Sequence, residues 1–565
     1  MGLISLKGVN FCYKNGKVKA LDDINLEFES GEVVVIMGPT GAGKSTLCHT
    51  LNGLIPHLIK GEFNGSVTIN GLNTQIHKTK KLAPVLGLIF QDFETQLFST
   101  NVELEVAFGP ENIGLPREEI KNRVNESLKF VRLNGFEQRQ PATLSGGQKQ
   151  RLAIASVLSL NPQILCMDEP TTDLDPIGRK EIFAVTRELN SLNIKTIIIV
   201  EHETEEIIDS DRIVLMEKGK ILTIASTHQV LRNVSLLRNL GIMPVQVTEL
   251  FFDLGSSTLP LTPGEAKKLF EEKGWSISED TYNNFSKKDS EQRVKWGKNI
   301  IQAKNLSHWY DGRTPAIQDV DLIISEGEFL AIVGQNGSGK TTLVKHFNGL
   351  LLPTTGSVYV EDKNTQDKDT CALSRIVGYV FQNPDHQIFA ERIADEVAFG
   401  PKLHGLSEHE VNYRVEEALE AVGLQDFRDE DPFVLTKGQR QRVAVASVLA
   451  SKPKVIVLDE PTTGLDYKEL RGMMELVKKL NAAGHTIIIV THTMWVVAEY
   501  AHRVVVMGGG RIVLDGPTRE VFSKEEELKA LFLKPPAIVS LGNSLGYTTL
   551  SIEEFKNCME KGREM

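Results

Sequence analysis

Two glycine-rich segments carry the residue types that bind phosphate groups. Residues 38–46 read GPTGAGKST and residues 334–342 read GQNGSGKTT, and both fit the pattern G-x-x-x-x-G-K-[ST]. In such a loop, backbone N–H groups wrap the phosphates at a helix N-terminus, the lysine reaches the terminal phosphates and the next hydroxyl binds Mg²⁺. The pattern assigns nucleotide binding to Gly38, Gly41, Gly43, Lys44, Ser45 and Thr46, and to Gly334, Gly337, Gly339, Lys340, Thr341 and Thr342.

Each loop is followed by an apolar run that ends in Asp-Glu and, 33 or 34 residues after the aspartate, by a histidine. An aspartate at the end of a buried strand can hold Mg²⁺ beside a nucleotide, and the glutamate after it can polarise an attacking water molecule. The matched spacing favours a functional role for the histidines, which would contact the γ-phosphate. The candidates are Asp168 and Asp459 for the metal, and Glu169, Glu460, His202 and His492 for catalysis.

A third repeated segment precedes each aspartate by the same distance. Residues 144–148 read LSGGQ and open a predicted helix, in which Ser145 is the expected N-cap and Gly147 leaves an amide facing an anion. The second copy, residues 435–439, reads LTKGQ and keeps Thr436 and Gly438. Lys437 replaces a glycine there. Either the two sites are unequal, with the site containing Lys340, Glu460 and Ser145 the faster one, or this lysine points to solvent and changes little.

The elements that must position these residues also occur twice. Continuous apolar runs precede the phosphate loops, the Asp-Glu pairs and the histidines, and runs of this length are typical of central strands in a mostly parallel sheet. We therefore expect two α/β domains of the phosphate-loop type. The predicted divisions are a first domain at 1–222, a helical appendage at 223–277, a linker at 278–298, a second domain at 299–515 and a second helical appendage at 516–565.

Composition narrows the functional class. The 565 residues are 41% hydrophobic, and no apolar run approaches the roughly 20 residues that a membrane-spanning helix needs. The net charge of −11 argues against a nucleic-acid partner, which usually requires a basic surface. The five cysteines are scattered without a C-x-x-C pair, which indicates packed thiols rather than metal ligands.

Together these motifs resemble the ATP-binding-cassette family, in which two cassettes pair head-to-tail and the LSGGQ segment of one closes over ATP held by the other. The resemblance implies that each domain has an antiparallel β subdomain and a helical subdomain carrying that segment. It implies that Tyr13 and Tyr310 stack on adenine, and that Gln91 and Gln382 sense Mg²⁺ and water. The implied cofactor is Mg²⁺ with ATP as substrate. Asp173 stands where the second half has a glycine, Gly464, and we interpret it as a turn carboxylate.

Two further repeated segments resemble the ATPases of energy-coupling factor (ECF) importers. Residues 90–98 and 381–389 read FQDFETQLF and FQNPDHQIF, and EVAFGP follows each at 105–110 and 396–401. The chain is similar to the fused, two-cassette form of these ATPases. The resemblance implies a motor at the cytoplasmic face of the cell membrane, attached peripherally through a transmembrane T component and a substrate-binding S component. It would drive uptake of a vitamin, a vitamin precursor or a transition metal.

The same resemblance predicts partners for the acidic residues of these segments. Arginines on the coupling helices of the T component would bind Asp92, Glu94 and Asp385, although the alternative of solvated loop carboxylates stays open. Two other classes of function also remain alternatives. A soluble two-cassette ATPase could act on the ribosome, and a two-cassette ATPase could serve a binding-protein-dependent sugar importer.

Overall fold

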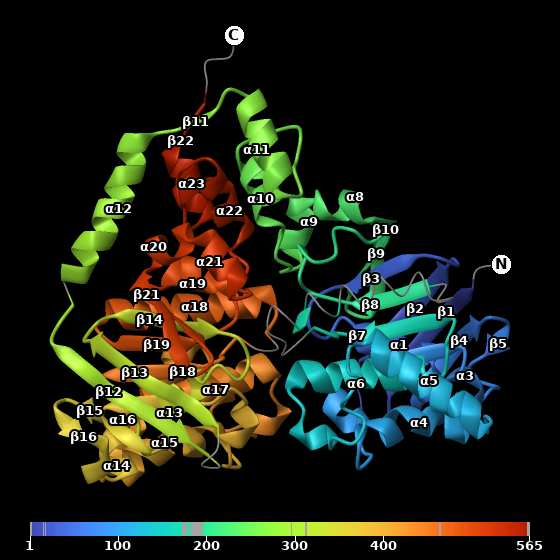
Figure 1. Ribbon diagram of the computed structural model, residues 1–565, viewed down its shortest axis with the longest axis horizontal. Helices are drawn as coiled ribbons and strands as arrows, with labels where there is room; N and C mark the ends of the chain where they lie inside the picture. Colours follow the sequence, from blue (N-terminus) through green and yellow to red (C-terminus); the bar gives the residue numbers. More distant parts are fainter. Residues whose placement is uncertain are drawn as a thin grey trace. The chain divides into compact units, whose positions relative to one another are not determined.

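The chain forms two compact units. The computed structural model describes residues 3–14, 16, 18–171, 178–179, 182, 196–294, 296–310, 314–462 and 465–561. The first unit comprises residues 1–252 and 257–261, and the second comprises residues 253–256 and 262–565. Figure 1 shows both units coloured along the chain.

The first unit contains an antiparallel sheet and a mostly parallel sheet. The antiparallel sheet has the strand order β2-β1-β4-β5, and the other sheet has the order β10-β9-β3-β8-β7-β6, in which only the pairing of β10 with β9 is antiparallel. Their strands are β1 Ile4–Tyr13, β2 Leu21–Phe28, β3 Val33–Met37, β4 Gly61–Ile69, β5 Leu72–Asn73, β6 Leu86–Ile89, β7 Ile164–Asp168, β8 Thr196–Val200, β9 Arg212–Glu217 and β10 Lys220–Ser226.

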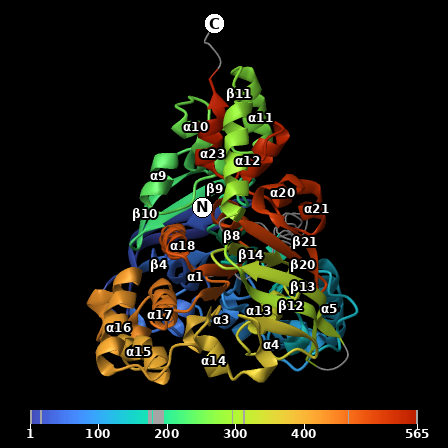
Figure 2. The same cartoon turned by 90° about the vertical axis from the view of Figure 1, so that its left-hand side faces the viewer.

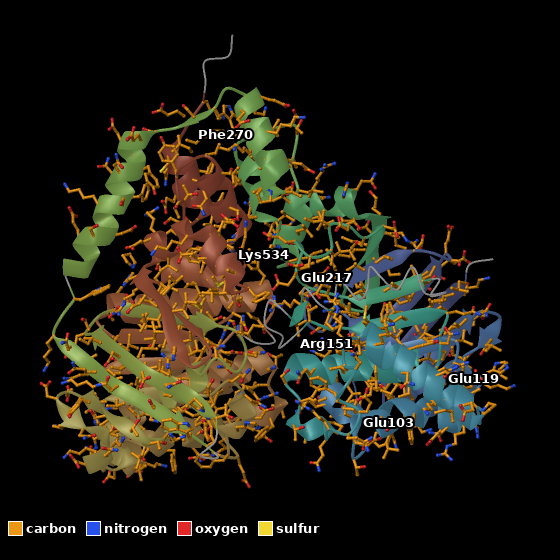
Figure 3. All side chains as sticks on the ribbon, viewed as in Figure 1. Glu103, Glu119, Arg151, Glu217, Phe270 and Lys534 are labelled. Carbon is orange, nitrogen blue, oxygen red and sulfur yellow. The ribbon has the colours of Figure 1, made fainter. Side chains whose placement is uncertain are left out.

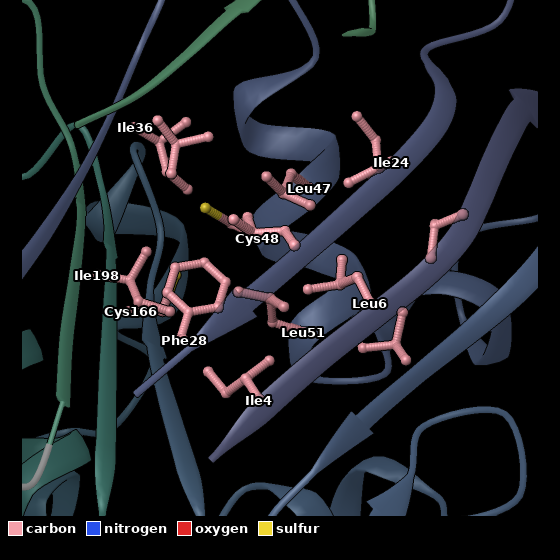
Figure 4. Close-up of a cluster of buried hydrophobic side chains, with 14 of the residues drawn as sticks. Ile4, Leu6, Ile24, Phe28, Ile36, Leu47, Cys48, Leu51, Cys166 and Ile198 are labelled. Atoms are coloured by element: carbon pink, nitrogen blue, oxygen red, sulfur yellow. The ribbon is translucent and has the colours of Figure 1, made fainter. Parts of the chain in front are cut away.

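Helices cover both faces of the parallel sheet in this unit. The described helices are α1 Lys44–Leu51, α2 Leu54–His57, α3 Thr79–Leu82, α4 Val102–Asn112, α5 Arg117–Phe130, α6 Gly146–Leu158, α8 Thr227–Leu231, α9 Val234–Asn239 and α10 Gln246–Asp253, with short 3₁₀ turns η1 Phe93–Gln96 and η2 Pro141–Thr143. One buried cluster joins α1 to residues of both sheets (Figure 4). A second cluster joins the opposite face of the parallel sheet to α4, α5 and α6.

Burial on both faces explains the continuous apolar runs in the sequence. Along β7, Cys166 faces α1 and the antiparallel sheet, whereas Leu165 and Met167 face the α4–α6 side. Since side chains alternate along a strand, a strand covered on both faces needs apolar residues at successive positions. The apolar run of β7 ends at Asp168, which is one of the candidate metal ligands.

The second unit repeats this plan. Its antiparallel sheet has the order β13-β12-β15-β16 and its mostly parallel sheet has the order β17-β18-β19-β14-β20-β21. Their strands are β12 Asn299–Trp309, β13 Pro315–Ser325, β14 Phe329–Gly334, β15 Thr355–Val360, β16 Lys363–Asn364, β17 Val377–Val380, β18 Val455–Asp459, β19 Thr486–Val490, β20 Arg503–Gly508 and β21 Arg511–Pro517.

The helices of the second unit include a group that gathers at one end, α15, α16 and α17 (Figures 1 and 2). The cassette helices are α13 Lys340–Lys345, α14 Thr370–Ser374, α15 Ile393–Leu403, α16 Glu408–Val422, α17 Lys437–Leu449, α18 Tyr467–Ala482 and α19 Met494–Tyr500, with 3₁₀ turns η3 Thr365–Asp367, η4 Pro384–His386, η5 Gln425–Phe427 and η6 Pro432–Val434. The predicted fold class, two α/β phosphate-loop domains with antiparallel and helical subdomains, is confirmed.

Elements from both predicted appendages and from the predicted linker pack together inside the second unit. These elements are α11 Pro263–Glu272, β11 Ser276–Ile277, α12 Glu279–Val294, α20 Thr518–Ser523, α21 Glu525–Ala530, α22 Ala537–Ser544, α23 Ile552–Cys558 and β22 Met559–Glu560. Helix α11 packs on α22, and β11 pairs with β22 in antiparallel register. Phe270 of α11 meets Phe555 of α23 with ring centroids 5.8 Å apart (Figure 3).

This packing places the unit boundary inside the predicted appendage 223–277, so that α11 and β11 group with the second unit. The predicted linker, 278–298, contains the helix α12. Asp289 of α12 accepts a hydrogen bond of 2.8 Å from Nε of Arg519 in α20. The predicted linker is therefore held to the second unit by a specific contact.

Candidate functional site

In each unit, a phosphate loop connects a central strand of the mostly parallel sheet to a helix with buried residues. In the first unit the loop connects β3 to α1, and in the second it connects β14 to α13. Gly43 has φ 97°, and a Cβ there would lie 2.4 Å from the carbonyl oxygen of Ala20. Gly339 has φ 97° as well. Only glycine fits both the left-handed backbone and this close approach, so the requirement for glycine is geometric.

The loop lysines lie inside their loops rather than in solvent. Nζ of Lys44 donates to the carbonyl oxygens of Gly38 and Pro39 at 2.9 and 3.0 Å. Nζ of Lys340 donates to Gly334 and its neighbour Gln335 at 2.8 and 2.9 Å. Both ammonium groups are therefore buried at the loop, where a phosphate could replace these carbonyl partners.

A glutamate, a glutamine and a histidine converge beside each loop. In the first unit, Nε2 of Gln91 donates to Oε2 of Glu169 at 2.6 Å, and Nε2 of His202 lies 2.7 Å from Oε1 of the same carboxylate. Gln91 follows β6, Glu169 follows β7 and His202 follows β8. The carboxyl ends of neighbouring parallel strands meet at one sheet edge, which explains how residues 111 positions apart come together.

The second unit repeats the arrangement. Nε2 of Gln382 donates to Oε2 of Glu460 at 3.0 Å, and Nε2 of His492 lies 2.7 Å from Oε1 of Glu460. Both glutamates have left-handed backbones, with φ 48° at Glu169 and φ 50° at Glu460. Such a conformation costs about 1–3 kcal/mol in a residue with a side chain, and it commonly occurs at functional sites. The sequence did not predict this left-handed conformation.

The aspartates before these glutamates have different surroundings in the two units. Asp168 and Asp459 are both buried. Burial raises the pKa of Asp168 to about 6, against the opposing effect of the Ser45 hydroxyl. Burial also raises the pKa of Asp459, although hydroxyl groups of Tyr379 and Thr341 donate to it and act in the opposite direction.

The donor set at each aspartate fits Mg²⁺. Oδ1 of Asp168 is buried and has no hydrogen-bond partner among the described residues, and a hydroxyl and a glutamine amide lie on the neighbouring elements. Hard oxygen donors of this kind suit Mg²⁺, which in nucleotide sites takes one or two protein ligands together with phosphate oxygens and water. The described part of the chain has no group of three or more His, Cys, Asp or Glu side chains placed to hold a metal.

The tyrosines expected at adenine lie beside the phosphate-loop helices. The hydroxyl of Tyr13 is 2.9 Å from Oγ1 of Thr46, and the hydroxyl of Tyr310 is 3.1 Å from Oγ1 of Thr342. Both residues are exposed, Tyr13 by 40% and Tyr310 by 65%. An exposed ring tethered through its hydroxyl is available for stacking on a flat ligand.

The LSGGQ-like segments form helix N-termini. Ser145 is the N-cap of α6, as predicted, and forms a capping box with Gln148. Thr436 forms the equivalent box with Gln439 at the start of α17. Lys437 occupies the first turn of α17 and is exposed. A Cβ at the matching glycine of the first unit would meet nothing within 4 Å, so the lysine is accommodated without strain.

Sequence reasoning missed two residues that contact the site. Glu201, buried just before His202, accepts hydrogen bonds from the Thr171 hydroxyl at 2.6 Å and from the His202 backbone N–H at 2.8 Å. The residue equivalent to Glu201 in the second unit is Thr491, which precedes His492. Tyr379, which donates to Asp459, was the other omission. Asp173 and Gly464 lie outside the described residues.

A second repeated feature lies beside each glutamine. Phe98 and Phe108 are both exposed and pack edge to face at 4.6 Å, and Phe389 and Phe399 do the same at 4.9 Å. The buried carboxylate of Glu105 holds this turn in the first unit, because it accepts from the backbone N–H groups of residues 98 and 99 at 3.0 and 2.7 Å. Exposed aromatic pairs on a fixed turn are typical of contact surfaces for another protein.

The acidic residues predicted to bind arginines already have partners within the chain. Oε1 of Glu94 accepts from Nζ of Lys149 at 2.7 Å, and Asp385 accepts from Nε of Arg440 at 2.6 Å. Asp92 caps the turn η1 through a 3.4 Å hydrogen bond from the Thr95 N–H. A basic partner would therefore compete with a cation of the chain at Glu94 and Asp385.

Comparisons with known proteins identify the family of the chain. A family model described as ABC transporter matches residues 21–172 and 317–463. A relative from Caldanaerobacter subterraneus subsp. tengcongensis, named as an ABC transporter ATP-binding protein, is 55% identical over 99% of both chains. A relative of the same description from Methanosarcina acetivorans is 42% identical over 94% of this chain and 89% of its own. The structure of cbiO1 from Clostridium perfringens, described as part of the ABC transporter complex cbiONQ, is 37% identical, covers 42% of this chain and 97% of that chain, and has a TM-score of 0.38.

Proposed function

The chain belongs to the ABC transporter family and carries two ATP-binding cassettes, and from that premise we propose that it is the ATP-hydrolysing motor of an ECF-type importer. The observation that carries the ATPase assignment is the repeated cluster of glutamate, glutamine and histidine beside a phosphate loop. The resemblance of residues 90–98, 105–110, 381–389 and 396–401 to ECF ATPases supports the importer class.

In this proposal each loop holds the phosphates of one ATP molecule. Ser45, Asp168 and Gln91 would hold Mg²⁺ at the first site, and Thr341, Asp459 and Gln382 would hold it at the second. Bound Mg²⁺ would neutralise charge on the phosphate oxygens. The ammonium groups of Lys44 and Lys340 bind the same phosphates when they leave their carbonyl partners.

In this proposal Glu169 and Glu460 orient the attacking water and accept its proton. In the first unit, the amide of Gln91 and the imidazole of His202 hydrogen-bond to the two oxygens of Glu169, which fixes the carboxylate plane before substrate arrives. In the second unit, the amide of Gln382 donates to one oxygen of Glu460, and Nε2 of His492 lies 2.7 Å from the other. Fixing a catalytic group in advance lowers the reorganisation needed during reaction. These contacts support the proposal that both glutamates act as general bases.

We propose that the two cassettes pair head-to-tail. In that arrangement Ser145 and Gly147 complete the ATP site of Lys340, and Thr436 and Gly438 complete the site of Lys44. The covalent connection raises the effective concentration of one cassette for the other, which favours closure.

The exposed phenylalanine pairs are the proposed contact surface for coupling helices of the T component. Figure 1 places α4 and α15, which carry Phe108 and Phe399, at the ends of their respective units. None of the described helices is long and apolar enough to span a bilayer, so the proposal needs separate membrane proteins. The S component would carry the specificity for a vitamin, a vitamin precursor or a transition metal, and the motor would be peripheral at the cytoplasmic face.

A pull-down tests the importer class. The tagged chain is recovered from detergent-solubilised membranes of its source, and partners are identified by mass spectrometry. A small polytopic T protein with an S protein is the expected result. Ribosomal proteins, or a permease with a sugar-binding protein, would instead support one of the two alternative functions and overturn the ECF assignment.

A surface variant tests the contact surface itself. Changing Phe98 and Phe389 together to Glu should abolish recovery of the T protein, because two charges would be buried against an apolar helix. Changing Ile76 to Glu is the matched control, since Ile76 is 76% exposed and lies away from these turns in the sequence. Retained binding in the double variant would place the T contact elsewhere.

A further inference from the structure

The two proposed Mg²⁺-binding aspartates differ in one neighbour. Oδ2 of Asp459 accepts a 2.6 Å hydrogen bond from the hydroxyl of Tyr379, and Oδ1 accepts a 3.1 Å hydrogen bond from Oγ1 of Thr341. In the first unit, Oδ1 of Asp168 is buried without a hydrogen-bond partner among the residues that the structure describes. The carboxylate of the second site is therefore held at both oxygens, and that of the first site is not.

The strand register explains the difference. Tyr379 on β17 lies opposite Val457 on β18, two residues before Asp459. Leu88 on β6 lies opposite Cys166 on β7, two residues before Asp168. Side chains two residues apart share one face of a sheet, so both residues point along the face that carries the aspartate. A tyrosine at this position reaches the carboxylate with a donor, whereas a leucine has none.

We propose that Tyr379 is a positioning residue for Mg²⁺ at the second site, and that this site binds the metal more tightly than the first. The proposal rests on the MgATP chemistry proposed above. Side chains that hydrogen-bond to a metal-ligating carboxylate fix its orientation, and their loss typically lowers metal affinity by about 10–100-fold. The phenol leaves lone pairs on both oxygens of Asp459 for the metal or its bound water.

The Tyr379 hydroxyl can be removed with little change in packing. The side chain is 7% exposed, and its ring packs edge to face on Phe381 at 4.9 Å. A phenylalanine fills the same space, so Tyr379→Phe isolates the hydrogen bond. Burial and the adjacent Asp459 charge raise the pKa of Tyr379 well above its usual range, which keeps the hydroxyl protonated as a donor across working pH.

Binding of Mn²⁺ with ADP to the full chain tests the proposal without requiring hydrolysis. Free Mn²⁺ is counted by electron paramagnetic resonance in a Lys44→Ala background, in which nucleotide binding is confined to the second site. Tyr379→Phe should raise the Mn²⁺ dissociation constant about tenfold or more. ADP affinity in EDTA should stay unchanged. Tyr413→Phe, at an exposed tyrosine, is the matched control and should alter neither quantity.

An unchanged Mn²⁺ dissociation constant in Tyr379→Phe would overturn the proposal. An equal loss of metal-free ADP affinity would also overturn it, since that result indicates a structural role. Should the variant fail to fold, the sites are compared through Lys44→Ala and Lys340→Ala. About tenfold tighter Mn²⁺ binding in Lys44→Ala supports the proposal, and equal affinities refute it. Failure of the importer proposal appears separately, as a missing T protein in the pull-down.

Discussion

Loss of the Arg519 side chain should strongly destabilise the second unit. Its guanidinium donates to Glu554, to the carbonyl oxygen of Thr548 at 2.6 Å and to Asp289 at 2.8 Å, and it lies 5.4 Å from the ring centroid of Tyr282. The side chains of Arg519 and Glu554 are 9% and 8% exposed, whereas that of Asp289 is 40% exposed. The buried pair therefore dominates the energy, and the Asp289 contact contributes about 0–1 kcal/mol.

Changing Arg519 to Met leaves Glu554 buried without its cation. Breaking a buried pair in this way costs about 3–5 kcal/mol. For a unit of this size we take a urea m-value of about 3 kcal/mol/M, so the unfolding midpoint should fall by about 1–1.7 M. Because the charge left behind causes most of this cost, Arg519→Met combined with Glu554→Gln should recover much of the loss.

Tryptophan fluorescence measures this unit alone. The chain has four tryptophans, Trp275, Trp296, Trp309 and Trp495, and all lie in the second unit. Asp289→Asn is the matched control, with an expected shift below about 0.3 M. If Arg519→Met shifts the midpoint no more than Asp289→Asn does, the inference that the buried pair anchors the appendage is wrong.

Three further predictions concern catalysis, pH and the phosphate loop. Glu460→Gln should lower ATP turnover more than Glu169→Gln, each by up to about 10²–10⁴-fold at its own site, and equal losses would refute the inequality of the sites. Burial lowers the pKa of His502 to about 4. The neutral imidazole therefore stabilises the second unit above pH 6.5, and the free energy of unfolding should fall by about 3 kcal/mol as the pH falls toward 4. The variant His502→Asn should remove this pH dependence. Urea unfolding followed by tryptophan fluorescence measures it, because Trp296 stacks on the His502 imidazole with ring centroids 6.4 Å apart. Gly43→Ala should abolish nucleotide binding at the first site in filter-binding assays of a Lys340→Ala background, and retained affinity would contradict the steric argument.

The repeated elements and most site positions were predictable because each leaves a local signal. An apolar run between polar residues marks a buried strand, and the spacing from Ser145 to Asp168 repeats from Thr436 to Asp459. The fold class follows from such signals, and it is confirmed. The roles of the individual site residues stay predictions, although the structure brings the glutamate, glutamine and histidine of each unit into contact.

Other features have no local signal. Tyr379 sits in an apolar run and resembles a core aromatic until the strand register places it against Asp459. Glu169 has a left-handed backbone with φ 48°, a conformation that its residue type does not predict. The pairing of Ser276 with Glu560 joins residues 284 positions apart, which neither periodicity nor propensity reports. Long-range pairing of this kind depends on the folded unit as a whole.

The pairing of β11 with β22 predicts that the two halves of this protein stay associated without an intact backbone between them. A proteolytic nick after Gly297 would produce fragments 1–297 and 298–565, and the first fragment would retain α11, β11 and α12. Those elements bind α22, α23, β22 and Arg519 of the other fragment. The nicked halves should therefore co-elute, and two separately translated halves could assemble through the same tails. In this chain, fusion of the cassettes keeps the two halves in a one-to-one ratio. The contacts of α11, β11 and α12 with α22, α23 and β22 would keep the halves attached.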